Sequence, residues 1–135
     1  MPALNFSVFV DQVENGLRAH PRPGVRCKTQ TIRKMRKRPI KAGDTLYLYT
    51  KQRTRNSRKL GEVTCKSADH IEMDEICYSN GDVMGYWIAI NGQELRCCDE
   101  QDALARADGF ENREEFFEWF GTHHGMPFDG QLIKW

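Results

Sequence analysis

Short stretches of alternating apolar and polar residues dominate the chain and predict β-strands. They are rich in the β-branched and aromatic residues that strands favour. Asn80-Gly81 and Asn91-Gly92 supply dipeptides that favour tight hairpin turns. The predicted strands are Leu4–Phe6, Thr45–Thr50, Leu60–Lys66, Ile71–Tyr78, Val83–Ile90, Leu95–Cys97 and Gln131–Trp135. Five or six strands in succession, joined by sequential turns, indicate a small mixed or antiparallel barrel.

Apolar residues at helical spacing predict helices beside these strands. The first helix is expected to begin at Ser7, a common N-cap residue. The second is expected to begin at Asp99 and to stop at Gly109. The third is expected to begin at Asn112, whose spacing from Glu115 resembles a capping box. Its apolar stripe indicates core packing rather than base stacking and consists of Phe116, Phe117, Trp119 and Phe120. The predicted fold class is therefore α+β.

The length and the hydropathy pattern bound the organisation of the chain. At 135 residues the chain suits one hydrophobic core, and we expect a single domain over residues 1–135. No apolar run approaches the roughly 20 residues that a membrane helix needs. The first residues lack the basic flank and long apolar block of a signal peptide. We expect a cytosolic protein without membrane contact, and we favour a monomer.

The near-neutral net charge of +1 conceals two segments of opposite sign. Residues 26–59 hold 13 basic and 1 acidic side chains, which gives 13 − 1 = +12. Residues 60–135 hold 5 basic and 16 acidic side chains, which gives 5 − 16 = −11. Because an ordinary solvated surface mixes both signs, the basic segment indicates an anionic partner.

The basic segment carries the candidate nucleic-acid contacts. They form two clusters on either side of the predicted strand Thr45–Thr50. Tyr47 and Tyr49 lie between the clusters, and basic grooves with aromatic platforms suit single-stranded or looped nucleic acid. The predicted contact residues are Arg26, Arg33, Lys34, Arg36, Lys37, Arg38, Lys51, Arg53, Arg55 and Arg58. The expected partner is therefore single-stranded or looped nucleic acid.

Lys28, Thr31 and Asp108 are the candidate catalytic residues. Neighbouring Arg26 and Arg33 disfavour the protonated form of Lys28, which makes a neutral, nucleophilic amine accessible if the site is also desolvated. Asp108 is expected in the last turn of a helix, where the dipole raises the pKa of a carboxylate and suits it to proton transfer. In a regular strand Lys28 and Thr31 would point to opposite faces, so they converge only if the backbone turns there.

The cysteines and histidines do not form a metal-binding pattern. The five cysteines are odd in number, and none has the CxxC spacing of a zinc site. Cys97 and Cys98 are adjacent, as are His123 and His124, and adjacent residues are poorly placed to share one ion. We expect reduced thiols, no metal and no cofactor.

The segments Lys28-Thr29-Gln30-Thr31-Ile32-Arg33 and Lys41-Ala42-Gly43-Asp44 resemble the ASCH family, a group of small PUA-like β-barrels. The segment Ala107–Phe110 and the closing Leu132–Trp135 resemble further parts of the family pattern, so the likeness spans most of the chain. The resemblance implies a PUA-like barrel with a cleft beside Lys28 and with RNA or a nucleobase as ligand.

One branch of the family consists of amidohydrolases that remove the acetyl group of acetylcytidine with a lysine, a threonine and a glutamate. Lys28 and Thr31 match the first two by motif, and Asp108 falls at the position of the glutamate. The resemblance therefore adds a second hypothesis, an amidohydrolase, to the first, an RNA- or nucleoside-binding module. RNA cleavage is a weaker third hypothesis, because no histidine pair is placed for acid and base catalysis. A fourth is that the basic segment binds an acidic protein or the acidic half of a second copy.

Overall fold

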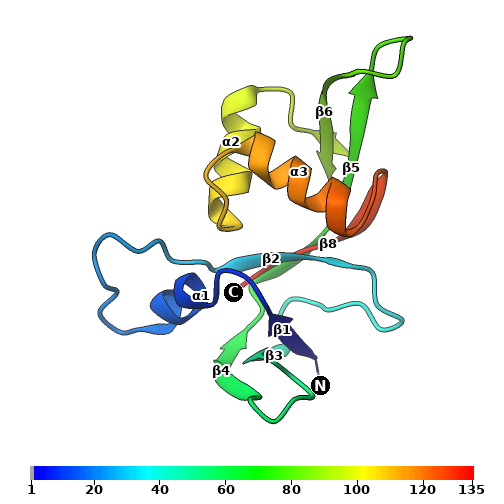
Figure 1. The fold of residues 1–135 in the computed structure, drawn as a ribbon. Coiled ribbons are helices and arrows are strands. Elements are labelled where there is room, and N and C mark those ends of the chain that lie inside the picture. Colours follow the sequence, from blue (N-terminus) through cyan, green and yellow to red (C-terminus); the bar gives the residue numbers. More distant parts are fainter. Residues whose placement is uncertain (1) are drawn as a thin grey trace.

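The structure, a computed structural model, describes residues 2–135 and contains helices packed on two β-sheets (Figure 1). The helices are α1 (Val10–Leu17), α2 (Cys98–Ala107) and α3 (Arg113–His123). The strands are β1 (Ala3–Phe6), β2 (Gln30–Lys34), β3 (Thr45–Thr50), β4 (Arg58–Thr64), β5 (Ser67–Cys77), β6 (Val83–Ile90), β7 (Gln93–Glu94) and β8 (Phe128–Lys134). The predicted α+β class is confirmed.

The described strands form two open sheets, whereas the sequence predicted one barrel of five or six strands. The smaller sheet has the order β1-β3-β4, with β1 parallel to β3, and the larger sheet has the order β2-β8-β5-β6-β7. The two sheets approach each other at β1 and β2, where arginine side chains replace a backbone ladder. Arg33 Nη2 donates to Asn5 O at 2.7 Å, and Arg36 Nη2 donates to Ala3 O at 2.6 Å. Apolar alternation predicts strands but not which strands pair, so this opening was not foreseen.

Strand β8 lies between two hydrophobic clusters and contributes to both. Leu132 belongs to the cluster under α2 and α3, which also contains Ile71 and Phe116. The next residue, Ile133, belongs to the cluster that packs α1 on the smaller sheet. Because successive strand residues point to opposite faces, one strand links the two halves of the core. Lys66 N also donates to Lys134 O at 2.8 Å, where the chain passes from β4 to β5.

Several predicted elements are confirmed at or near their predicted bounds. Strands β3 and β6 begin and end at the predicted residues. The third helix begins after Asn112, whose side chain accepts a hydrogen bond from Glu115 N at 3.0 Å. In a capping box the Glu115 carboxylate would accept from the backbone N–H of Asn112. Here it accepts from the N–H of the preceding residue, Glu111. The aromatic side chains predicted to be core, Phe116, Phe117 and Phe120, are buried.

Other boundaries differ from the prediction. The N-cap of α1 is Phe9 rather than Ser7, and the N-cap of α2 is Cys97 rather than Asp99. Asp99 lies in the first turn of α2, where the helix dipole still favours its charge. The strand predicted at Leu95–Cys97 is wrong at those residues: the structure has the two-residue strand β7 (Gln93–Glu94) just before them, and Leu95 N donates to Ile88 O at the end of that pairing. No helix within residues 2–135 is long and apolar enough to cross a membrane.

Candidate functional site

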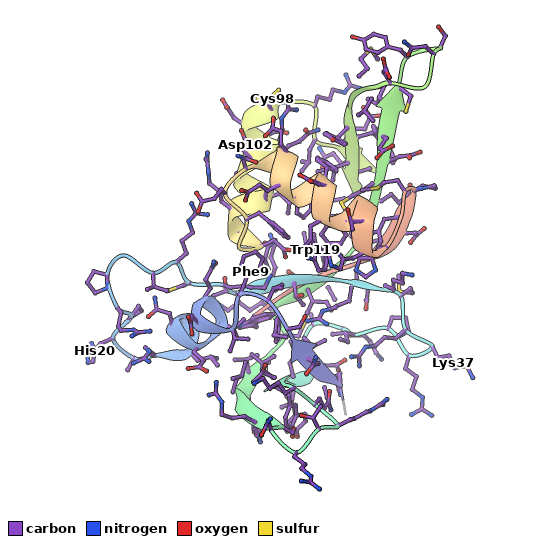
Figure 2. The ribbon with its side chains drawn as sticks, in the orientation of Figure 1. Phe9, His20, Lys37, Cys98, Asp102 and Trp119 are labelled. Atoms are coloured by element: carbon purple, nitrogen blue, oxygen red, sulfur yellow. The ribbon has the colours of Figure 1, made fainter. Side chains whose placement is uncertain are left out.

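A cavity of about 280 Å³ opens beside β2, between the β1–α1 connection and α3. Phe9 and Trp119 lie close together in the space between α3 and β2 (Figure 2). The cavity is lined by four segments of the chain that are distant in sequence. Its principal polar lining residues are Asn5, Lys28, Thr31, Arg33, Asp108 and His124, and its principal aromatic ones are Phe6, Phe9, Phe110, Trp119 and Phe120.

Lys28, Thr31 and Asp108, the three candidate catalytic residues, line this one cavity. Lys28 lies two residues before β2 begins, and its backbone N–H donates to Gln12 O of α1 at 2.9 Å. Thr31 lies inside the regular β2–β8 ladder opposite Ile133. Because Lys28 lies outside the strand, the alternation of side chains along β2 does not force it to the face opposite Thr31. The two side chains can therefore point into the same cavity, as the sequence analysis required. Their catalytic role stays a prediction.

Lys28 and Asp108 form a buried ion pair. Lys28 is 3% exposed and Asp108 is 4% exposed, and Lys28 Nζ lies 3.3 Å from Asp108 Oδ1. The ammonium also donates a short hydrogen bond to the backbone oxygen of Asp108. Burial lowers the pKa of Lys28, and the attraction of Asp108 only partly restores it. Burial likewise raises the pKa of Asp108, against the attraction of Lys28. Both shifts favour the neutral forms that proton transfer requires.

Two buried polar atoms at this pair make no hydrogen bond with the described residues, although one of them is the carboxylate oxygen that Lys28 Nζ approaches at 3.3 Å. They are Asp108 Oδ1 and Gln30 Nε2. The Gln30 amide makes a minor contribution that lowers the pKa of Asp108, but the two groups do not reach hydrogen-bond geometry. Asp108 lines the cavity, so a ligand group that donates to its carboxylate gains affinity, whereas Gln30 is not among the lining residues.

Arg33 keeps the cavity positively charged. Its Nε donates to Thr31 Oγ1 at 3.0 Å, and its guanidinium carbon lies 4.8 Å from the centre of the Phe6 ring. Burial lowers the pKa of Arg33 to about 10, which leaves it charged at neutral pH. The Thr31 hydroxyl is thereby held by an arginine rather than by Lys28. This contact fixes Thr31 for a ligand but also engages one of its lone pairs.

The sequence did not predict the aromatic wall of the cavity. Phe9 has a positive φ of 59°, and its ring packs edge-on against Phe110 at 4.9 Å between centroids. Gly109 has a φ of 111°, and a Cβ there would lie 2.8 Å from the Phe9 ring. Trp119 was assigned to the core with its neighbours, yet it is only partly buried and lines the cavity. Helical periodicity cannot tell a core residue from a cavity residue here, because Trp119 lies at the edge of the apolar face and contacts both the core and the cavity.

His124, which follows α3, is a further polar group that the sequence did not assign to the site. Burial, and then the charge of Lys34, lower the pKa of His124, so its ring is neutral at neutral pH. The ring lies 5.5 Å from Trp119 and 5.4 Å from Phe120 between centroids. A neutral imidazole offers one donor and one acceptor to a ligand.

Four of the ten predicted nucleic-acid contacts already have partners within the protein. Arg26 donates to Phe110 O at 2.7 Å and pairs with Glu111, and Arg58 pairs with Glu14. Arg33 and Arg36 hold β1 as described above. The remaining six have no ion pair or side-chain hydrogen bond with any described residue, and they are Lys34, Lys37, Arg38, Lys51, Arg53 and Arg55.

A second, open cavity of about 700 Å³ lies along the loop between β2 and β3. We call it the basic groove, and its cationic lining residues are Arg36, Lys37, Arg38 and Lys41. The acid that lines it, Asp44, accepts a hydrogen bond from Lys41 N at 2.9 Å. The loop is anchored by Gln131 of β8, whose buried amide accepts from Ile40 N at 3.1 Å and donates to Ile40 O at 2.9 Å.

The described residues contain one group of three potential metal ligands. His70, Glu72 and Asp129 have ligand atoms within 4.8 Å of one another. His70 Nε2 lies 2.7 Å from Asp129 Oδ1, and its Nδ1 lies 3.5 Å from Glu72 Oε1. Because the two ring nitrogens face different carboxylates, the arrangement is that of a histidine bridging two acids. The five cysteines are unpaired thiols.

Comparisons of the chain with protein-family models, with curated proteins and with solved structures found no match.

Proposed function

We propose that this chain is an ASCH-like module that binds an unstacked or modified nucleobase, presented by RNA or by a free nucleoside, in the cavity beside Lys28. The observation that carries the proposal is the combination of an aromatic wall with buried polar and charged side chains in one small cavity. Trp119 and Phe9 supply faces for a base, and the lining side chains of Asp108 and Arg33 supply an acceptor and donors for its edge. Recognition of unpaired bases relies on this pairing of stacking with edge contacts.

The size and charge of the cavity support a single base as the ligand. A volume of about 280 Å³ lies below the range of about 300–1,000 Å³ that is common for drug-sized ligands. The charged Arg33 at the cavity wall favours an electron-rich carbonyl or a nearby phosphate.

The arrangement of the sheets also supports a PUA-like origin. Two sheets that meet at β1 and β2, with a site at their junction, correspond to a small barrel that is open on one side. The segment from Lys28 to Arg33 that carries the family resemblance forms one wall of the cavity. We also propose a cytoplasmic location, because four exposed, unpaired thiols suit a reducing compartment.

Titration calorimetry with cytidine and acetylcytidine tests base binding. Base stacking on an aromatic side chain contributes about 1–3 kcal/mol, so Trp119→Leu should weaken binding by roughly 5- to 150-fold. Trp87→Leu is the matched control, because Trp87 lies on β6 and lines a different cavity. Absence of binding by the wild type, or equal loss in both variants, would refute the proposal.

The buried ion pair favours a second candidate function, hydrolysis of an acyl group on the exocyclic amine of cytidine. Neutral Lys28 would attack the amide carbonyl or direct water onto it, and Asp108 would carry the proton to the leaving amine. Water is consumed, and the products are acetate and cytidine. The lowered pKa of Lys28 and the raised pKa of Asp108 are the observation behind this candidate.

Chromatographic detection of cytidine released from acetylcytidine tests the second candidate. We expect release by the wild type and at least a hundredfold slower release by Thr31→Val and by Lys28→Met/Asp108→Leu. The rate of the wild type should rise with pH as Lys28 becomes neutral and fall again as Asp108 loses its proton. If the wild type binds acetylcytidine but releases no cytidine, the base-binding proposal stands and the hydrolase candidate is refuted.

A further inference from the structure

The loop between β2 and β3 holds several cations in place without neutralising them. Gln131 anchors Ile40 through both of its amide atoms, and Asp44 caps the turn through Lys41 N. Arg36 is held by a backbone oxygen, Ala3 O. These contacts order the loop, and no acidic side chain of residues 2–135 forms an ion pair with the cations Arg36, Lys37, Arg38 and Lys41. A preordered set of uncompensated cations favours an extended anion.

The cavity beside Lys28, which we call the base cavity, and the basic groove lie along the same strand, β1. Arg33, in the cavity wall, reaches Asn5 O, and Arg36, in the groove, reaches Ala3 O. The chain from Arg33 to Arg36 therefore runs beside β1 from one site to the other. Lys34 lines the base cavity on the way. In Figure 2 the loop bearing Lys37 extends to one side, away from Phe9 and Trp119.

The second basic cluster is built differently. Lys51, Arg53 and Arg55 lie in the turn after β3, beyond the other end of the smaller sheet. Because β1 runs parallel to β3, the groove residue Pro2 lies at the start of both strands, whereas Lys51 follows their ends. The turn is exposed and lines neither the basic groove nor the cavity beside Lys28, although Gln52 N donates to Oδ1 of the cavity residue Asn5 at 2.9 Å. These three cations serve as an internal comparison for the groove.

We infer that the ligand of the base cavity is one nucleotide of a single-stranded RNA, and that the basic groove binds the phosphates on one side of it. The inference rests on the proposed base recognition and deepens it, since it selects a polymer over a free nucleoside. It also assigns different roles to the two basic clusters, of which only the groove belongs to the RNA path.

Two charge-matched triple variants test the inference. Lys37→Gln/Arg38→Gln/Lys41→Gln removes three charges from the groove, and Lys51→Gln/Arg53→Gln/Arg55→Gln removes three from the turn after β3. Binding of a fluorescent single-stranded RNA dodecamer containing one cytidine is measured across a salt series, and cytidine binding is measured by calorimetry. A single strand contributes a log-log salt slope of about −0.7 per neutralised phosphate, so the groove variant should reduce the slope by about 2.

The expected result is that the groove variant loses at least tenfold in RNA affinity and keeps wild-type affinity for cytidine. The turn variant should keep most of its RNA affinity. Equal RNA loss in both variants would overturn the inference, as would wild-type RNA affinity no higher than that for cytidine. A salt-reversible dimer that RNA does not dissociate would also overturn it, because the groove would then hold a second copy. If neither cytidine nor RNA binds, the base-binding proposal itself fails.

Discussion

At the scale of single residues, the site depends on an ion pair that the fold buries at a cost. Lys28 and Asp108 are each less than 5% exposed and lie 3.3 Å apart. Removing two charges from water is commonly more costly than their mutual attraction recovers. Such a pair is therefore more easily explained by function than by stability. The same burial supplies the neutral forms that the proposed chemistry uses.

Lys28→Met should destabilise the protein by about 3–5 kcal/mol, because it leaves Asp108 buried without its partner. Lys28→Met/Asp108→Leu should recover this loss and equal or exceed the wild type by about 1–4 kcal/mol at neutral pH. Urea unfolding of the wild type and both variants measures these differences. A double variant clearly less stable than the wild type would show that the pair stabilises the fold.

The advantage of the double variant should depend on pH. The raised pKa of Asp108 gives the wild type a stabilising contribution that is complete below pH 3.8 and lost as the pH rises through the folded pKa. The lowered pKa of Lys28 gives a destabilising contribution that disappears only as the pH approaches 10.5. The stability advantage of the double variant over the wild type should therefore be largest at pH values above the folded pKa of Asp108 and below 10.5. A constant difference from pH 4 to pH 10 would contradict the two shifts.

Gly109→Ala tests the packing of the aromatic wall. The substitution combines a strained φ of 111° with a Cβ placed 2.8 Å from the Phe9 ring. Gly81→Ala is the control, since Gly81 has a similar φ of 94° and open space around its Cβ position. Both should lose about 1–3 kcal/mol from backbone strain, but only Gly109→Ala should also weaken cytidine binding. Unchanged cytidine affinity in Gly109→Ala would show that Phe9 does not shape the site.

At the scale of elements, β2 and its flanks position the site. Lys28 precedes the ladder, Thr31 and Arg33 share one face within it, and the basic groove follows it. The close approach of β8 is permitted by Gly130, where a Cβ would lie 2.1 Å from Arg33 O. One short strand thus connects the base cavity to the groove.

Gln131→Met should loosen the basic groove. The variant keeps a long, apolar side chain but leaves Ile40 N and Ile40 O without their partners, which costs about 1–3 kcal/mol per buried group. Hydrogen exchange at residues 36–41 should accelerate, and RNA affinity should fall while cytidine affinity holds. Unchanged exchange in this loop would show that Gln131 is not its anchor.

The strands and the site residues were predictable from the sequence to different degrees. The β-branched and aromatic content of Thr45–Thr50 and the Asn80-Gly81 turn before Val83–Ile90 predicted both strands at their observed bounds. Lys28, Thr31 and Asp108 were found through the family resemblance and through residue chemistry, and the cavity brings them together. Phe9, Trp119 and His124 were missed, because their roles depend on which helix faces which sheet edge. The separation into two sheets was missed for the same reason, because it also depends on tertiary packing.

At the scale of the whole molecule, opposite charges are separated along the chain and within the structure. The segment from β5 through β7 contains no lysine or arginine, whereas the path beside β1 carries the base cavity and the basic groove. A polyanion is therefore drawn to one edge of the protein and repelled from the hairpin of β5 and β6. Under the proposed function, this polarity would bring an approaching strand to the cavity beside Lys28.

The most direct test of base recognition is an NMR titration of the wild-type protein with cytidine, observing the three tryptophan indole N–H signals. Trp119 lines the base cavity, whereas Trp87 lies on β6 beside a different cavity and serves as the internal reference. The Trp119 signal should shift in a saturable manner while the Trp87 signal stays in place. A Trp119 signal that does not move, or a Trp87 signal that moves equally, would contradict base binding in this cavity.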